Sequence, residues 1–243
     1  MKEIKTAWAL FRYSRIKDWP LLGLFFALKF LRVERRFKLT LRDYEWTAST
    51  TKPSGLHFFN EVIIHECYSS IRADIRNIKS PLIIDGGANC GSFALWALSI
   101  NPGAHIISFE PGEAFESLSL NQKLYSRKHG DNWEIQKCAL SSSVGMGSVE
   151  QIDNSSMGRF IEGGSNPVRC RTIDDLNQEI QILKIDVEGF EVEVLKGSEK
   201  TLSTAKLVIL EYHSNDLRRQ CQEFLLSHGF QLKEDGYLLI GYR

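Results

Sequence analysis

The stretch IIDGGANCGSF, residues 83–93, decides the fold. An apolar run typical of a buried strand ends in an aspartate, a glycine-rich loop follows, and then a helical pattern begins. Glycines in such a loop permit positive φ angles and let the backbone approach a ligand closely. The first turn of the helix adds N–H groups that lack intrahelical partners. The stretch therefore predicts the strand–loop–helix unit with which ligand-binding α/β sheets begin.

Strands and helices alternate along the chain from this unit onward. Helix-linked strands normally form a parallel sheet, so the pattern predicts a doubly wound α/β fold. Asp235-Gly236, between the last two strand-like runs, is a hairpin signal that makes the final pair antiparallel. Residues 153–167, rich in Ser, Gly and Asn, are expected to form a loop. The expected strands are 81–85, 105–110, 133–140, 144–152, 168–174, 181–187 and 205–212, and the expected helices are 91–100, 112–130, 190–202 and 215–229.

The glycine loop suits two classes of adenosine-containing ligand. Counted from Gly86, the pattern is G-x-A-x-x-G, a near match to the dinucleotide fingerprint G-x-G-x-x-G. Counted from Asp85, an acid followed by Gly87 and Gly91 is the pattern of S-adenosylmethionine enzymes. Glu110 ends the next strand, where a carboxylate can accept both hydroxyl protons of a ribose. Both ligands contain a ribose, so these residues predict an adenosine cofactor without choosing between the two.

A second motif, KIDVEGFEVEVLKG at residues 184–197, places Asp186 and Glu188 directly after another apolar strand. Carboxylates at the mouth of a buried strand are costly to desolvate unless something there uses them. His213 follows a third strand, and the carboxyl ends of parallel strands meet at one edge of the sheet. We therefore expect these three side chains in the functional site. The alternatives are that Glu188 caps the next helix and that His213 is an exposed residue opening a helix.

Composition narrows the class of protein further. Lys+Arg and Asp+Glu are both 30, so net charge provides no reason to expect a nucleic-acid partner. The five cysteines are scattered, odd in number and without C-x-x-C spacing. That pattern argues for a reducing, cytoplasmic compartment and against a disulfide framework or a zinc site. The histidines form no ligand cluster in the sequence, so no metal site is predicted.

The N-terminal part of the chain differs from the rest. Residues 1–52 carry 12 basic and 5 acidic side chains, net +7, which leaves the remainder at −7. The pattern before residue 80 is less regular, and we place a boundary between a basic segment, residues 1–53, and a domain, residues 54–243. The elements expected in this region are strands at 37–43 and 44–50 and a helix at 54–70.

The longest apolar run, Trp19–Leu31, lies in the basic segment. It is shorter than the ~20 residues that a bilayer span needs, and no small-residue cleavage site marks it as a signal peptide. Basic residues flank it on both sides. Residues 19–36 are therefore expected either to make peripheral contact with a membrane surface or to pack on the domain.

Five stretches together resemble the FkbM family of S-adenosylmethionine-dependent methyltransferases. They follow the family's order and spacing from about residue 55 to 230, and the motif at 184–197 is the most specific of them. The resemblance implies a class I methyltransferase fold, a Rossmann-like, mostly parallel sheet of seven strands with an antiparallel last strand. That agrees with the hairpin expected at the C-terminus. The stretches are LIIDGGANCGSFAL, ISFEPGEAFESL, CALSSSVG, LKIDVEGFEVEVLKGSEKTL and LVILEYH.

Carried over residue by residue, the resemblance implies a site for S-adenosylmethionine. Glu110 would hold the ribose, and Pro111 would shape the turn after it. Cys138 and Ala139 would lie against the adenine. The helix before the core would close over the pocket through Glu61 and Tyr68. The methionine end of the cofactor would be lined by Asp85, Gly86, Gly87, Ala88, Asn89 and Gly91.

The resemblance also implies the reaction. Asp186 and Glu188 would lie beside the sulfonium and the acceptor, which is expected to be a hydroxyl of a sugar, glycan or secondary metabolite. An alcohol acceptor needs a base that takes its proton as the bond forms, and Asp186 is the first choice for that base, His213 the second. A nicotinamide-dependent oxidoreductase and a non-catalytic cofactor-binding module at a membrane surface are the alternatives. The identity of the acceptor and the oligomeric state are not predicted.

Overall fold

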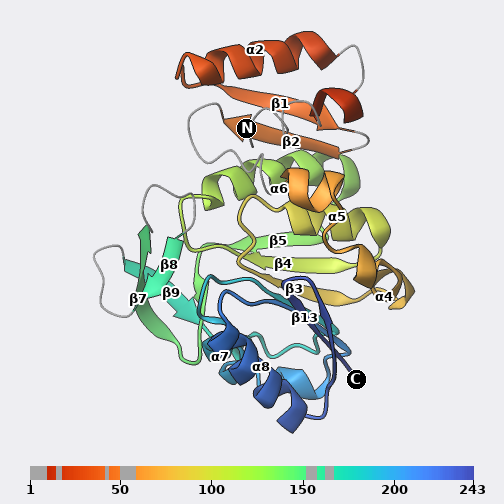
Figure 1. The fold of residues 1–243 in the computed structure, drawn as a ribbon, viewed down its shortest axis with the longest axis vertical. Coiled ribbons are helices and arrows are strands. Elements are labelled where there is room, and N and C mark those ends of the chain that lie inside the picture. The colour runs from red at the N-terminus through yellow and green to blue at the C-terminus, as the bar shows by residue number, and fades with distance from the viewer. Residues whose placement is uncertain (1–9, 15–17, 42–43, 50–58, 152–157, 162–166) are drawn as a thin grey trace.

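The computed structural model describes residues 10–14, 18–41, 44–49, 59–151, 158–161 and 167–243. Its centre is a seven-stranded sheet in the order β12-β13-β11-β10-β3-β4-β5 (Figure 1). The five strands from β11 to β5 in that order are parallel, whereas β13 is antiparallel to both of its neighbours. The predicted doubly wound sheet with a C-terminal hairpin is confirmed. The strands are β3 (Leu82–Gly86), β4 (His105–Phe109), β5 (Trp133–Gln136), β10 (Ile182–Ile185), β11 (Leu207–Glu211), β12 (Gln231–Asp235) and β13 (Leu238–Tyr242).

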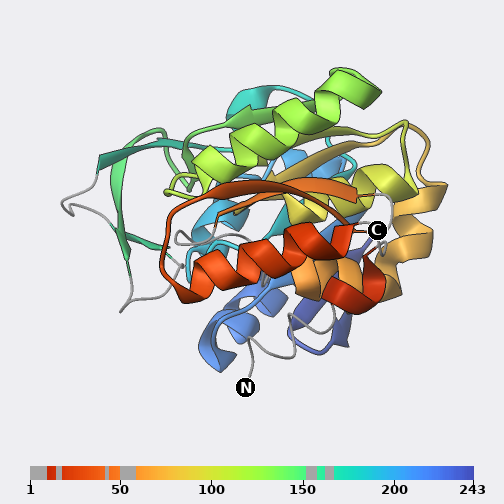
Figure 2. The ribbon, with the colours of Figure 1, turned by 90° about the horizontal axis from the view of Figure 1, so that it is seen from above.

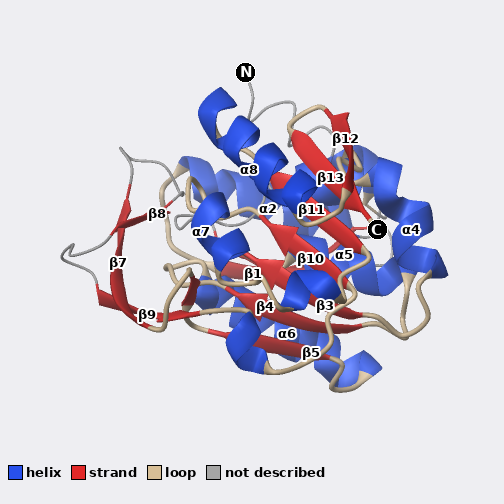
Figure 3. Cartoon of the chain, turned by 90° about the horizontal axis from the view of Figure 1, so that it is seen from below, coloured by secondary structure: helices blue, strands red, loops and turns tan. Residues whose placement is uncertain are grey.

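Helices cover both faces of this sheet because its inner strands are apolar on both sides. Ile83 and Ile84, neighbours on β3, are both fully buried, but in different hydrophobic clusters. A strand buried on both faces needs a helical layer on each, and the carboxyl ends of the parallel strands then share one edge. The layer on one face is α4 (Arg72–Asn77), α5 (Ser92–Ile100) and α6 (Phe115–His129), and on the other it is α7 (Glu191–Lys196) and α8 (Asn215–Ser227) (Figures 1 and 3).

Two of the predicted elements differ from the structure. The expected strand at 133–140 is divided, because β5 stays in the central sheet while Ala139–Leu140 (β6) pairs with β9. Within the expected loop at 153–167, Gly158–Ile161 forms a strand (β8) that pairs with β7, and residues 153–157 and 162–166 lie outside the described residues. The result is a second sheet at the side of the molecule (Figure 3). It has the order β6-β9-β7-β8, with β7 at Gly145–Gln151 and β9 at Pro167–Arg171.

The segment before the core forms a layer of its own on α5 and α6. β1 (Arg36–Leu41) and β2 (Tyr44–Ser49) correspond to the two expected strands and form an antiparallel pair, which α2 (Trp19–Phe30) covers (Figures 1 and 2). The backbone N–H of Thr47 donates to Asn121 Oδ1 on α6 at 2.6 Å. The ring of Trp46 stacks on Phe59 at 3.9 Å between centroids. These contacts dock the hairpin firmly on the α/β core.

The helix expected at 54–70 is only partly present. Residues 54–58 lie outside the described residues. The rest is a π-helical turn (η2, Asn60–Ile64) followed by a 3₁₀ turn (η3, Ser69–Ile71) that leads into α4. Among the described helices, none combines the length and the apolar character that crossing a membrane requires.

Candidate active site

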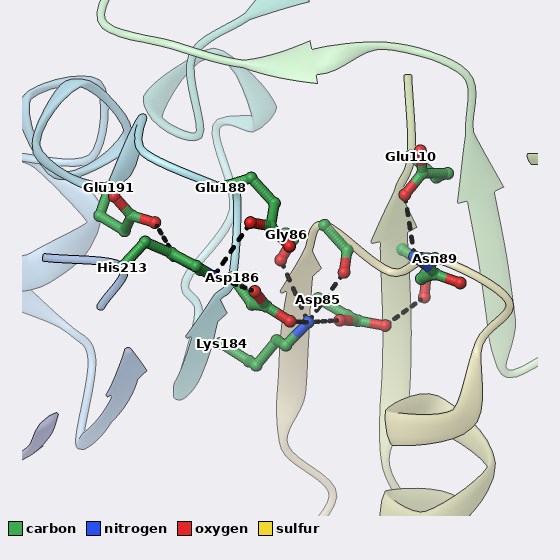
Figure 4. Close-up of polar contacts among 11 residues, drawn as sticks. Asp85, Gly86, Asn89, Glu110, Lys184, Asp186, Glu188, Glu191 and His213 are labelled. Atoms are coloured by element: carbon green, nitrogen blue, oxygen red, sulfur yellow. Dashed lines mark hydrogen bonds and ion pairs between the residues drawn. The ribbon is translucent and has the colours of Figure 1, made fainter. Parts of the chain in front are cut away.

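The glycine loop lies at the carboxyl end of β3 and is tied to the neighbouring strand β4. The backbone N–H groups of Gly87 and Ala88 both donate to the carbonyl of Phe109 at 3.0 Å. Asn89, in the left-handed region with φ +49°, donates its N–H to Glu110 Oε2 at 2.9 Å. These bonds fix the loop beside Glu110, as Figure 4 shows.

The carboxylate of Glu110 is held in place by backbone amides. Besides the bond from Asn89, Glu110 Oε1 accepts the N–H of Gly112 at 2.8 Å. Burial raises the pKa of Glu110, and the two amide bonds oppose that effect. A carboxylate oxygen has two lone pairs, so each oxygen of Glu110 can accept a second hydrogen bond. The residue predicted to hold a ribose is therefore positioned and still able to accept from a diol.

Gly87 is glycine because the loop touches the second motif. Its φ is +72°, and a Cβ there would lie 1.7 Å from the carbonyl oxygen of Asp186. Gly91, at φ +86°, is similarly close to Trp133, with 2.6 Å between an added Cβ and the indole ring. The absence of a side chain thus lets Gly87 pack against the backbone of the second motif and lets Gly91 pack against the indole ring of β5.

A buried lysine connects the two motifs. Lys184 lies opposite Asp85 in the β10–β3 register, and its Nζ is 3.1 Å from Asp85 Oδ1 and 3.5 Å from Asp186 Oδ2. The ammonium also donates to the carbonyls of Gly87 at 2.9 Å and Gly86 at 3.3 Å. Burial alone would lower the pKa of Lys184, but the two carboxylates outweigh it and hold the pKa above its ordinary value. Lys184 therefore fixes both Asp186 and the loop.

Asp85 faces the interior of the protein. It is fully buried, and its second oxygen accepts from Ser108 Oγ at 3.0 Å, which in turn accepts from Trp133 Nε1 at 2.9 Å. The side chain of Ala88 is also buried in the core. Asp85 is thus buried under the loop, where it holds Lys184, and the partly exposed residues of the loop are Gly87 and Asn89.

His213, which follows β11, lies among carboxylates from the second motif. Its Nδ1 is 2.8 Å from Glu191 Oε1, and its Nε2 is 3.2 Å from Glu188 Oε2 and 3.7 Å from Asp186 Oδ1. The chain reaches this arrangement through two residues in the left-handed region, Glu188 at φ +53° and Gly189 at φ +105°. The expected convergence of Asp186, Glu188 and His213 is therefore present (Figure 4).

The electrostatics of this cluster assign a charge to His213. Burial alone would lower its pKa, but the hydrogen bond to the fully buried Glu191 and the charges of Glu188 and Asp186 raise the pKa of His213 to about 9. At neutral pH the side chain is therefore an imidazolium. A protonated His213 would orient and neutralise the carboxylates around it, and its role as a base stays a prediction.

Glu211, the last residue of β11, joins the same cluster. Burial and then the charge of Asp186 raise the pKa of Glu211 to about 7. One oxygen or nitrogen from each of Asp186, Glu211 and His213 lies within 4.8 Å of the others, a donor set that could hold a cation. No metal site was predicted, because the histidines are scattered in the sequence. The fold brings His213 to two acids, so the absence of a metal stays a prediction.

Three residues of the cluster were not predicted as site residues from the sequence: Lys184, Glu191 and Glu211. A usable signal existed for Lys184, since a lysine inside an otherwise apolar strand must find a buried partner. Glu211 is the acid that ends the strand before His213, much as Glu110 directly follows β4. For Glu191 no signal in the sequence distinguishes it from Glu193, the partly exposed acid of α7.

The remaining predicted site residues lie around the edges of this region. Cys138 and Ala139 are 3% and 4% exposed, so their contact with an adenine stays a prediction. Pro111 is partly exposed directly after Glu110. Tyr68 is buried against the ring of Phe93, 5.1 Å between centroids, and its place over the pocket stays a prediction. Glu61 is exposed, and its negative charge adds to the rise in the pKa of Glu211.

Comparison with known proteins agrees with this geometry. Residues 85–237, more than half of the chain, match the methyltransferase FkbM domain. Methyltransferase sdnD of Sordaria araneosa is 28% identical over 228 residues, which cover 76% of this chain and 85% of that protein. The hexuronic acid methyltransferase AglP of Haloferax volcanii is 30% identical over 178 residues, 68% of this chain and 72% of that protein.

A solved structure shares the fold. The crystal structure of methyltransferase FkbM from Methylobacillus flagellatus KT superposes with a TM-score of 0.56 at 16% identity, covering 78% of this chain and 54% of that one. The match to the domain extends from Asp85 in the glycine loop through Glu110 and the second motif to Tyr237. The chain therefore belongs to the FkbM family and is a methyltransferase.

Proposed function

We propose that this methyltransferase uses S-adenosylmethionine to methylate a hydroxyl of a sugar, glycan or secondary metabolite. The observation that carries the proposal is the group of carboxylates, Asp186, Glu188 and Glu211, gathered at the strand edge next to the glycine loop. A relative named a hexuronic acid methyltransferase supports the choice of a sugar hydroxyl.

The residues at this edge fit such a cofactor. Glu110 retains lone pairs for a ribose diol, and Gly87 and Asn89, the partly exposed residues of the loop, can contact a ligand closely, whereas Gly86 and Gly91 are buried. Burial is the largest cause of the raised pKa values of Glu188 and Glu211, and negative neighbours add to it. A sulfonium cation bound beside them would favour the ionised form of these carboxyl groups, which would in turn stabilise the cation.

Within the site, Asp186 is the proposed base. S-adenosylmethionine bound there would supply a methyl group on a positively charged sulfur. The acceptor oxygen must be held about 3 Å from that methyl, in line with the bond that breaks, and its proton must leave as the new bond forms. Asp186 is fixed by Lys184 on one side and faces His213 on the other. Because His213 is protonated at neutral pH, it would position Asp186 and Glu188 rather than take the proton.

Calorimetry tests the cofactor. We expect Glu110→Ala to abolish S-adenosylmethionine binding, because it removes both ribose acceptors and releases Asn89 and Gly112. The matched control is Glu113→Ala, which removes an exposed carboxylate three residues away and should bind like the wild type. Equal affinity in wild type and Glu110→Ala would contradict the proposed site. Titration of NADH and NAD⁺ in the same buffer tests the oxidoreductase alternative, and we expect no heat of binding.

Turnover tests the chemistry. Labelled methyl donor is incubated with a panel of uronic acids, neutral sugars and glycans, and the products are identified by mass spectrometry. Asp186→Asn should keep cofactor affinity and lower turnover about 10²–10⁴-fold, whereas the exposed Asp175→Asn should be unchanged. Binding of the cofactor without turnover of any acceptor would favour the non-catalytic alternative. Activity that survives dialysis against EDTA is expected if no metal takes part.

A further inference from the structure

The helix α2 is apolar around its whole circumference although it lies at the surface. Its inner side buries Leu22 and Phe25 on the β1–β2 hairpin. Its outer side carries no charged residue until Lys29, and Phe30 at its end is 88% exposed. A helix that is apolar all round is normally buried on all sides. The outer side of α2 therefore needs an explanation beyond packing on its own domain.

The exposed apolar side chains are concentrated on this segment. Ten large apolar side chains are exposed in the described part of the chain, and six of them lie within residues 19–33. Contiguous exposed apolar surface marks an interaction site, whereas single exposed side chains need no explanation. We call these residues of α2 and the turn after it the α2 face. They are Trp19, Leu21, Leu24, Phe30, Leu31 and Val33.

The charge around the α2 face is positive. The described residues from 10 to 41 include six basic and two acidic side chains. In the sequence, segment 1–52 carries a net charge of +7 and the remainder of the chain −7. An anionic surface would attract the first and repel the second, and would thereby orient the protein with the α2 face toward it.

The position of α2 allows it to meet a flat surface. It is the outermost element at one end of the molecule's long axis, with the hairpin between it and the rest of the protein (Figures 1 and 2). A 12-residue helix is about 18 Å long, well below the ~30 Å of a bilayer core. Its inner side is also committed to the hairpin. The helix can thus lie in the interface of a bilayer but cannot cross it.

A bilayer fits this face better than a second copy of the chain does. A symmetric dimer would place the same positive surface opposite itself, which costs free energy unless anions intervene. We propose that the α2 face is a peripheral attachment surface for an anionic lipid bilayer, in which Trp19, Leu24 and Phe30 enter the headgroup region while the basic residues meet the lipid charges. This inference does not depend on the proposed reaction.

Sedimentation with vesicles tests it. Wild-type protein should sediment with vesicles of phosphatidylcholine and phosphatidylglycerol, less with phosphatidylcholine alone, and less as salt increases. Leu24→Glu and Phe30→Glu should each weaken binding about tenfold or more, since each removes an apolar side chain that would enter the bilayer and adds a negative charge that the anionic lipids repel. The matched control is Leu226→Glu, an exposed leucine of α8, which should bind like the wild type. Circular dichroism confirms that each variant is folded.

Two outcomes would overturn the proposal. One is the absence of sedimentation with the anionic vesicles, or sedimentation that the two variants do not change. The other is a wild-type dimer, measured by light scattering, that Leu24→Glu converts to monomer while vesicle binding stays the same, because the α2 face would then be a subunit interface. Cofactor affinity, measured in parallel, should be equal in all variants, which keeps this test separate from that of the proposed function.

Discussion

Lys184 is the residue on which the two motifs depend most. It is 4% exposed and neutralises Asp85, which is fully buried. Removing one partner of a buried ion pair leaves an uncompensated charge and costs about 3–5 kcal/mol. We expect Lys184→Met to lower the free energy of unfolding by about that amount, measured by urea denaturation.

A double-mutant cycle separates this effect from a loss of packing. Lys184→Met combined with Asp85→Asn removes both charges, so the double variant should be less destabilised than the sum of the two single variants. Additive losses would show that the ion pair contributes nothing beyond the volume of its side chains.

His213 predicts a dependence of stability on pH. Its folded-state pKa of about 9 lies above the ordinary value of 6.5, so the folded protein binds the proton more tightly than the unfolded chain. The stabilisation is fully present below about pH 6.5 and is lost as pH rises through about 9. Between pH 6.5 and 9.5, wild-type protein should lose about 2–3 kcal/mol that His213→Gln does not lose. Urea denaturation at several pH values measures this difference, and parallel curves for the two proteins would contradict the assignment.

For single residues, the sequence predicts which side chains lie at the site better than it predicts which side chains contact each other. Asp186, Glu188 and His213 each follow a strand. Because the ends of parallel strands meet at one edge of the sheet, their proximity could be predicted from the sequence. The partners of Lys184 could not be predicted, because Lys184 meets Asp85 only through the register between β10 and β3. That register is set by the whole sheet and has no local signal.

At the scale of elements, the fit between the glycine loop and β10 allows a direct test. Gly87→Ala places a Cβ 1.7 Å from the Asp186 carbonyl at a φ of +72°, so either the loop or the end of β10 must move. We expect a loss of about 2–4 kcal/mol in the free energy of unfolding. Gly145→Ala is the control, because no atom lies within 4 Å of its Cβ. Gly145→Ala should change the free energy of unfolding by less than about 0.5 kcal/mol. A similar loss in both variants would show that the contact between residue 87 and Asp186 does not require glycine.

Elements whose ends carry a local signal were predicted well. α6 ends where expected, at Gly130 with φ +96°, and the final hairpin turns at Gly236 with φ +61°. The second sheet was not predicted, because β6 and β8 are short strands defined by pairing with β9 and β7. A composition of Ser, Gly and Asn indicates a loop only when no neighbouring strand supplies hydrogen bonds, and that information is tertiary.

At the scale of the whole molecule, charge and packing divide the chain differently. The boundary proposed between residues 53 and 54 follows the change from a basic to an acidic composition. The hydrophobic core crosses it, because Leu39, Trp46 and Ala48 belong to the same buried cluster as Ile83 and Trp96 of the central domain. A shared core couples the stability of the two parts, so we propose that they unfold together.

Trp46→Ala tests this coupling. Trp46 is 1% exposed and stacks on Phe59 across the boundary, and truncating such a side chain costs about 3–5 kcal/mol. If the two parts unfold together, hydrogen exchange followed by mass spectrometry should show equal losses of protection in β1 and in the central strands β3 and β10. Tyr237→Ala, which removes an aromatic ring that is 75% exposed, should leave both unchanged. Loss of protection confined to β1 and β2 would instead make the N-terminal layer an independent unit, attached to a domain that is stable without it.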